Sequence, residues 1–307
     1  VVTVADEAAE QRLATGLGKI LPGVPVVGEE AVEKDPGLLD LIARPGETCW
    51  IVDPLDGTAN FAAGRDRFAI IVCLVHDTMP VAGWILDVPR NHLAEAHRDG
   101  GVTLDGVSVA GRAPGRPLIG YVGYRVIKEF DRQLGREQRA RLGRLSTLSC
   151  AGLEYIELLS GRADFNLYRM TKPWDHAAGS LMMREAGGGS VQFNGSPYAP
   201  TQGLAAGLIS STSGEALDEA KAKFEILIPL NVVAPSVNLP SQKLVLQFED
   251  VTAKAGDRLL FGPLTFKATG LAPRPERGLR ERAFGVFEGL TWAEIERDHP
   301  EASERWR

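Results

Sequence analysis

Apolar residues recur with two different spacings along the chain, and the spacing predicts where helices and strands lie. Leu13 and Leu17 are one helical turn apart within 7–19, a stretch whose pattern is typical of an amphipathic helix. Nearly continuous apolar runs at 68–75 and 81–86 instead predict two buried strands joined by a turn. The chain therefore mixes helices with buried strands, as an α/β protein does.

The same patterns predict further elements, and they divide the chain. Shorter strands are expected at 24–27, 50–52, 93–96, 119–124, 163–168, 191–193 and 208–211. Further helices are expected at 35–43, 126–144, 153–159, 176–183 and 214–224. A stretch rich in Gly, Pro and Arg over 112–117 predicts a boundary between two subdomains.

One predicted strand ends in two carboxylates. Apolar residues 50–52 lead into Asp-Pro-Leu-Asp-Gly-Thr, which contains the residues that turns require. The proline between Asp53 and Asp56 restricts the backbone, so both carboxylates can be held in one geometry beside the Leu55 carbonyl. Such hard oxygen ligands suit Mg²⁺. On its own, the motif could equally be an acid-rich surface turn.

Other acidic residues lie next to the ends of predicted elements. Asp6 precedes the first helix, and Asp175 precedes 176–183, so each could serve simply as a helix N-cap. Glu29 and Glu30 follow Gly28 at the end of a strand, and we expect Glu30 to be a solvated surface charge. The residues alone leave capping and metal binding open.

Four motifs stand out along the chain: Thr-Val-Ala-Asp at 3–6, Gly-Glu-Glu at 28–30, the stretch from Trp50 to Phe61, and Pro-Trp-Asp-His-Ala-Ala-Gly at 173–179. In kind and order they resemble the motifs of the inositol monophosphatase family of metal-dependent phosphatases. The resemblance covers residues 1 to about 227. It implies an α/β fold, the layered αβαβα sandwich of sugar phosphatases. Related proteins carry a helix before the first motif, and we expect this N-terminal helix to be missing here.

The resemblance implies a metal site with two main ions. Glu29, Asp53 and the Leu55 carbonyl would hold one Mg²⁺ that activates water. Asp53, Asp56 and Asp175 would hold a second that stabilises the leaving alkoxide, and a third, weaker ion would bind near Glu29.

The resemblance also implies catalytic and phosphate-binding roles. Asp6 would hydrogen-bond Thr58, and this pair would orient the attacking water, so that Asp6, Glu29 and Thr58 form the catalytic set. Gly57 and Thr58 would start a helix whose free N–H groups contact the phosphate, with Asp56 and Asp175 beside them.

The expected activity is Mg²⁺-dependent hydrolysis of inositol phosphate or a related small sugar or alcohol phosphate. Histidinol phosphate, fructose 1,6-bisphosphate and 3′-phosphoadenosine 5′-phosphate remain alternative substrates, because nothing in the sequence separates them. A non-catalytic or defective scaffold of the same fold is the rival interpretation.

Composition limits the partners. The net charge of −6 argues against nucleic-acid binding through bulk electrostatics. No apolar run approaches the roughly 18 residues that span a membrane. Cys49, Cys73 and Cys150 each lie in or beside apolar stretches and are expected to be buried thiols in a reducing cytoplasm. We therefore expect a cytoplasmic protein that binds a small phosphorylated substrate, without nucleic acid or membrane, and that forms a homodimer as relatives commonly do.

The C-terminal part has a different character. We expect a phosphatase domain at 1–227, a linker at 228–240, and partial modules at 241–307 that are typical of a chimera. Residues from about 240 to 268 resemble the opening strands of an ABC-F-type ATPase but lack its phosphate-binding loop.

Residues from about 272 to 307 resemble a piece of the histidine phosphatase (phosphoglycerate mutase-like) family, with Glu281 matching its acid. The nucleophilic histidine motif is missing from the sequence, so neither ATP hydrolysis nor a phosphohistidine is expected from the C-terminal part.

Overall fold

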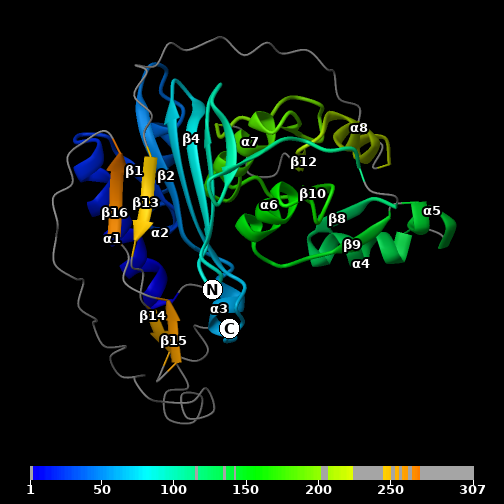
Figure 1. Ribbon diagram of the computed structural model, residues 1–307, viewed down its shortest axis with the longest axis horizontal. Helices are drawn as coiled ribbons and strands as arrows, with labels where there is room; N and C mark the ends of the chain where they lie inside the picture. The colour runs from blue at the N-terminus through cyan, green and yellow to red at the C-terminus, as the bar shows by residue number, and fades with distance from the viewer. Residues whose placement is uncertain are drawn as a thin grey trace.

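The computed structural model describes residues 3–114, 117–133, 136–141, 143–201 and 207–223, together with four short strands between 245 and 269. Two β-sheets lie side by side, with helices between them and on their outer faces (Figure 1). This arrangement is the expected layered αβαβα sandwich, which the structure confirms.

The first sheet has seven strands in chain order. They are β1 (Val26–Gly28), β2 (Thr48–Asp56), β3 (Ala69–His76), β4 (Met79–Asp87), β5 (His92–His97), β6 (Gly101–Leu104) and β7 (Val107–Val109). Only β1 and β2 are parallel, and each later pair is antiparallel. Asp77 and Thr78 both have positive φ, which suits the tight turn between β3 and β4.

Both faces of this sheet are covered because its strands are apolar on both sides (Figure 1). Helix α1 (Val4–Ile20) packs Leu13 and Leu17 against Trp50 and Trp84 on one face. Helices α6 (Ala151–Leu159) and α7 (Pro173–Glu185) cover the other face. Helix α2 (Glu29–Lys34) and a 3₁₀ helix (Pro36–Leu41) follow β1, and α3 (Thr58–Ala62) follows β2.

The second sheet has five strands in the order β11-β12-β10-β8-β9. They are β8 (Ile119–Val122), β9 (Arg144–Ser146), β10 (Phe165–Tyr168), β11 (Gly189–Val191) and β12 (Leu208–Ser211). Its inner face packs on α6 and α7, while α4 (Tyr124–Gln133) and α8 (Gly214–Lys223) contribute to the core on its outer side. Helices α6 and α7 are thus the middle layer between two sheets.

Several predicted elements differ in their bounds from those observed. Thr3 is the N-cap of α1, so the helix begins earlier than predicted. The strand predicted at 50–52 continues to residue 56 as β2. Within the helix predicted at 126–144, the structure describes two helices, α4 and α5 (Arg136–Arg141), and residue 144 already begins β9.

The C-terminal strands form two antiparallel pairs. They are β13 (Val245–Glu249) with β16 (Thr265–Thr269), and β14 (Ala253–Ala255) with β15 (Arg258–Phe261). The predicted linker at 228–240 and Glu281 lie outside the described residues. The sequence also predicts a helix at 292–297, which lies outside them as well.

Candidate active site

Three carboxylates from distant parts of the sequence converge at one edge of the middle layer. Glu29, Asp53 and Asp175 each offer an oxygen, and these oxygens lie within 4.8 Å of one another. Glu29 begins α2, Asp53 lies in β2, and Asp175 lies in the first turn of α7. Because β1 and β2 are adjacent parallel strands and α7 packs across the sheet, the fold itself assembles this group.

Burial and mutual repulsion make this group unfavourable without a cation. Asp53 is only 1% exposed. Burial, followed by repulsion from Asp56 and Glu29, raises the pKa of both Asp53 and Asp175 well above the ordinary value. A bound cation would offset both effects.

The donor set fits a hard divalent metal. Oxygens around one Mg²⁺ or Ca²⁺ ion lie roughly 3–5 Å apart, given metal–oxygen lengths of about 2.0–2.6 Å. The three carboxylate oxygens satisfy that spacing. Free Cys49, Cys73 and Cys150 are all buried, as predicted, and none belongs to this group.

Asp175 is not the N-cap of α7. The N-cap is Lys172, and Pro173 occupies the first helical turn, which places Asp175 inside the helix. The hypothesis that capping alone explains this aspartate is therefore wrong.

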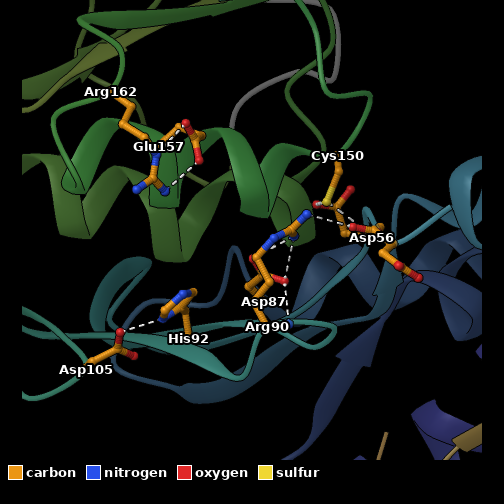
Figure 2. A network of polar contacts seen from close by, with 9 residues as sticks. Asp56, Asp87, Arg90, His92, Asp105, Cys150, Glu157 and Arg162 are labelled. Atoms are coloured by element: carbon orange, nitrogen blue, oxygen red, sulfur yellow. Dashed lines mark hydrogen bonds and ion pairs between the residues drawn. The ribbon is translucent and has the colours of Figure 1, made fainter. Parts of the chain in front are cut away.

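Asp56 lies next to the group but points elsewhere. Its Oδ2 accepts hydrogen bonds from the Gly152 N–H at 2.6 Å and from the Cys150 thiol at 3.1 Å (Figure 2). Among the described residues, Asp56 is not part of the three-oxygen group, although its charge is the largest carboxylate influence on Asp53 and Asp175. The structure thus brings four of the predicted acids together but orients one of them towards α6.

A break in strand register explains why both aspartates of β2 face the middle layer. Residues three apart in a regular strand point to opposite faces. The pairing of β2 with β3 shifts between Asp53 and Asp56, and Leu55 packs instead on the α1 side of the sheet. Such irregularities redirect side chains, and here both carboxylates turn to the same side.

The predicted hydrogen bond between Asp6 and Thr58 is confirmed. The Thr58 hydroxyl lies 3.1 Å from Asp6 Oδ1 and 3.0 Å from the Leu55 carbonyl, and both oxygens are acceptors. Asp6 is not the N-cap of α1, because it occupies the third helical position in a capping box with Thr3. A role for this pair in orienting water stays a prediction.

Gly57 adopts a backbone conformation that suits glycine. It is the N-cap of α3 with φ of 88°, and a Cβ there would lie 2.8 Å from the Arg67 carbonyl. Helix α3 begins at Thr58, as expected. Phosphate contacts from Gly57 and Thr58 stay predictions.

The expectation of a solvated Glu30 is wrong. Glu30 is 4% exposed, and burial, followed by repulsion from Asp6 and Glu29, raises its pKa to about 7. The physical reason is that α2 begins at Glu29, which turns the next side chain inward. The Glu10 carboxylate caps this helix by accepting the N–H groups of Glu30 and Ala31, both at 2.9 Å.

Several contacts of the site could not be found from sequence spacing. Glu10 lies 20 and 21 positions before the two residues whose N–H groups donate to it, and no motif marks it. Lys172 donates to Glu29 at 2.7 Å, and only its position beside the Pro-Trp-Asp motif hinted at a role. Cys150 stood out as an apolar-stretch cysteine, without any signal that it reaches Asp56.

A buried acid of α6 organises the loop that follows β9. Glu154 is 1% exposed, and burial raises its pKa to about 7. It accepts hydrogen bonds from the Leu148 N–H at 2.8 Å, from the Thr147 hydroxyl at 3.0 Å and from Tyr168. Asn60 of α3 holds the same loop through the Leu148 carbonyl at 2.9 Å. This network links the second subdomain to the start of α3.

The layered fold and its partly buried carboxylate group together define a phosphatase of the sugar phosphatase class. The match of a family model strengthens this conclusion. The chain belongs to the inositol monophosphatase family, whose model matches residues 1–226. Enzymes of this family depend on metal ions, and the carboxylate group provides the donors.

Several known proteins are similar in sequence to about two thirds of this chain. A fructose-1,6-bisphosphatase/inositol-1-monophosphatase of Thermotoga maritima is 28% identical over 197 residues, covering 64% of this chain and 72% of the relative. An inositol-1-monophosphatase of Rhizobium meliloti is 31% identical over 205 residues, covering 63% and 73%. A Nus factor SuhB of Pseudomonas aeruginosa is 30% identical over 204 residues, covering 64% and 73%.

Solved structures share the fold. An IMPase of Thermotoga maritima superimposes with a TM-score of 0.59 at 26% identity, covering 73% of this chain and 84% of that one. An inositol monophosphatase of Staphylococcus aureus superimposes with a TM-score of 0.61 at 24% identity, covering 72% and 83%. The second likeness bears on the fold alone.

The C-terminal part matches a second family. A model of the histidine phosphatase superfamily (branch 1) matches residues 264–307, which confirms the resemblance predicted from about 272. The ABC-F-like segment stays a prediction. In the part of the chain that the structure describes, no helix has the length and apolar character to cross a membrane.

Proposed function

We propose that the protein hydrolyses phosphate monoesters of inositol or of a related small sugar or alcohol, with Mg²⁺ as its metal. The observation that carries the proposal is the convergence of Glu29, Asp53 and Asp175. The names of the Rhizobium meliloti and Thermotoga maritima relatives support the substrate class.

The chain would hold its metal through these three carboxylates, with Asp56 and the Leu55 carbonyl as further ligands. When bound, divalent ions screen the charge of a phosphate dianion and lower the pKa of water. Hard oxygen donors favour Mg²⁺ over softer metals, which supports the choice of ion.

The residues Asp6 and Thr58 would orient the attacking water. Because the Thr58 hydroxyl donates towards Asp6 Oδ1 or the Leu55 carbonyl, its lone pairs are left to accept a hydrogen bond from the water. The water oxygen then presents its own lone pair to phosphorus, and the reaction is a direct in-line displacement. Backbone N–H groups at Gly57 and Thr58 would hold the phosphate.

We further propose that residues 1–227 form the catalytic domain, followed by a linker at 228–240 and partial modules at 241–307. The family match ends at residue 226, in agreement with this division. A cytoplasmic homodimer is the assembly that we expect.

The decisive experiment measures phosphate release from a panel of inositol, sugar and nucleotide monophosphates, with Mg²⁺ and with a chelator. It compares the whole chain with a chain ending at Leu230. We expect both to release phosphate only with Mg²⁺, and the best substrate to be an inositol or sugar phosphate. Fructose 1,6-bisphosphate and histidinol phosphate belong in the panel as alternatives.

Two variants test the site itself. Asp175→Asn and Asp56→Asn should abolish turnover while the circular dichroism spectrum is retained, because each removes a ligand charge without changing volume. Asp40→Asn, at an exposed acid, is the matched control and should keep full activity. Near-normal rates in the two site variants would contradict the proposal.

A second candidate is a non-catalytic scaffold of the same fold. The relatives named Nus factor SuhB favour testing it, since they match over a similar length. A folded chain that releases no phosphate from any substrate with Mg²⁺ would favour this candidate.

A further inference from the structure

Lys172 places a positive charge directly against the carboxylate group. Its ammonium donates to Glu29 Oε1 at 2.7 Å, and the two side chains are 35% and 18% exposed. The ammonium also lies 5.3 Å from the ring centroid of Trp174, within the range of a cation–π contact. Glu29 is therefore shared between Lys172 and the group formed with Asp53 and Asp175.

The backbone around Lys172 is held in place, so the ammonium is not a freely moving surface charge. Lys172 is the N-cap of α7, and Pro173 follows it. His176 Nε2 lies 3.1 Å from the Met170 carbonyl, which can only accept, so this nitrogen carries the proton. The other ring nitrogen, Nδ1, then accepts from the Tyr155 hydroxyl at 3.1 Å. The segment that carries Lys172 is thereby anchored on both sides.

A divalent cation bound by this group requires the same carboxylate that Lys172 contacts, that of Glu29. Glu29 is one of three carboxylates within 4.8 Å of each other, so a metal bound there and the ammonium would lie within a few ångströms. Like charges at that separation repel strongly in a partly buried site. The ammonium must either leave Glu29 or weaken the hold on the metal.

We propose that Lys172 is a positioning residue that competes with the divalent cation for Glu29 and thereby sets the metal affinity of the site. The proposal rests on the proposed function, in which the carboxylate group holds the metal. Lys172 balances part of the negative charge of the group and keeps metal binding weaker than the carboxylates alone would make it.

The test compares Lys172→Met, which removes the charge at similar volume, with Lys172→Arg, which keeps it. Lys34→Met is the matched control, since Lys34 forms an ion pair with Glu7 at 2.6 Å that is exposed on both sides. Titration calorimetry on the whole chain gives the dissociation constants of Mg²⁺ and Mn²⁺. Unfolding temperatures are recorded with chelator and with saturating metal.

We expect the dissociation constant of Lys172→Met to fall threefold to tenfold, which corresponds to about 0.7–1.4 kcal/mol. Lys172→Arg and Lys34→Met should stay within twofold of the unaltered chain. Lys172→Met should also unfold at a lower temperature in chelator, because the acids lose a compensating charge, yet show a larger rise on adding metal. A purely structural lysine would not give this pair of opposite changes.

Two outcomes overturn the inference, and they are distinct. If Lys172→Met binds metal no more tightly than the unaltered chain, Lys172 does not compete, and the proposed function is untouched. If the unaltered chain binds neither ion, while remaining folded, the proposed function and the inference both fail.

Discussion

Asp56 illustrates how neighbouring donors control a single buried acid. Burial raises the pKa of its carboxyl, while the Gly152 N–H and the Cys150 thiol lower it. Both donors bind the same oxygen, Oδ2 (Figure 2), so the metal contact that we propose for Asp56 would fall to Oδ1. The orientation of this carboxylate thus depends on two residues of the second subdomain.

Replacing Cys150 should therefore affect metal binding more than stability. We expect Cys150→Ala to weaken Mg²⁺ binding about fivefold, since one of two donors that fix Asp56 is lost. Cys150→Ser, whose hydroxyl also donates, should recover most of the affinity. Calorimetric titration of the two variants measures the effect, with Cys49→Ala as a buried cysteine away from Asp56. Equal affinity in Cys150→Ala and the unaltered chain would contradict this role.

Glu154 should make stability depend on pH. Its folded pKa of about 7 lies above the ordinary glutamate value, so the folded state binds an extra proton between about pH 4.5 and 7. This contribution to the free energy of unfolding is fully present below that window and is lost as the pH rises through 7.

Glu154→Gln removes the titration while keeping an oxygen that accepts from the Leu148 N–H, and its amide NH₂ group can donate to the Tyr168 hydroxyl. Denaturant unfolding measures the free energy of unfolding of both proteins at pH 5 and at pH 8. We expect the loss of stability between pH 5 and pH 8 to be smaller in Glu154→Gln than in the unaltered chain, by about 1–3 kcal/mol. An equal difference in both proteins would show that this carboxyl does not titrate in the window.

At the scale of elements, the end of β2 and the start of α3 form one unit. The register shift between Asp53 and Asp56 turns both acids towards the middle layer, and Gly57 then reverses the chain into α3. The arrangement depends on a positive φ at a position where a Cβ has no room.

Gly57→Ala should thus disturb both stability and activity. The strained φ and the contact with the Arg67 carbonyl should cost about 2–4 kcal/mol of unfolding free energy. Gly64→Ala is the control, because Gly64 also has positive φ but nothing lies within 4 Å of its Cβ position, so we expect about 1 kcal/mol. Thermal unfolding and phosphate release check both effects, and equal losses in the two variants would argue against crowding at Gly57.

The sequence predicted those parts of the site that are local. Asp53 and Asp56 lie within one short motif at the end of a predicted strand, and Asp175 lies in the Pro-Trp-Asp motif, so the resemblance of these local motifs to the family assigned them to one site. The contacts of Cys150 with Asp56 and of Lys172 with Glu29 join residues 94 and 143 positions apart. Such contacts follow from how the layers pack, which spacing along the chain cannot reveal. The burial of Glu30 was mispredicted because α2 begins at Glu29 and turns the next side chain inward.

At the scale of the whole molecule, the site lies where three layers meet. The first sheet supplies Asp53, the helix that follows β1 supplies Glu29, and the middle layer supplies Asp175. Their mutual repulsion opposes this packing, because like charges are held together in a buried place. Stability is therefore lower than the same layers would have without these charges.

A bound metal ion should offset the loss of stability that the repulsion between the three acids causes. At a Mg²⁺ concentration one hundred times its dissociation constant, we expect the free energy of unfolding to rise by about 2.7 kcal/mol. Asp53→Asn should be more stable than the unaltered chain in chelator, and should gain little from Mg²⁺. Denaturant unfolding of both proteins, with Mg²⁺ and with chelator, measures the four values. If Mg²⁺ does not raise the free energy of unfolding of the unaltered chain, this prediction is wrong.

The wide separation of the three acids in the sequence also has a consequence during synthesis. Glu29 and Asp53 leave the ribosome more than one hundred residues before Asp175. At about 5–20 residues per second, the first sheet has several seconds in which its acids lack the third partner. The complete set of donors arises only when α7 docks between the two sheets. Tight metal binding by a nascent chain would therefore indicate that α7 has docked between the two sheets.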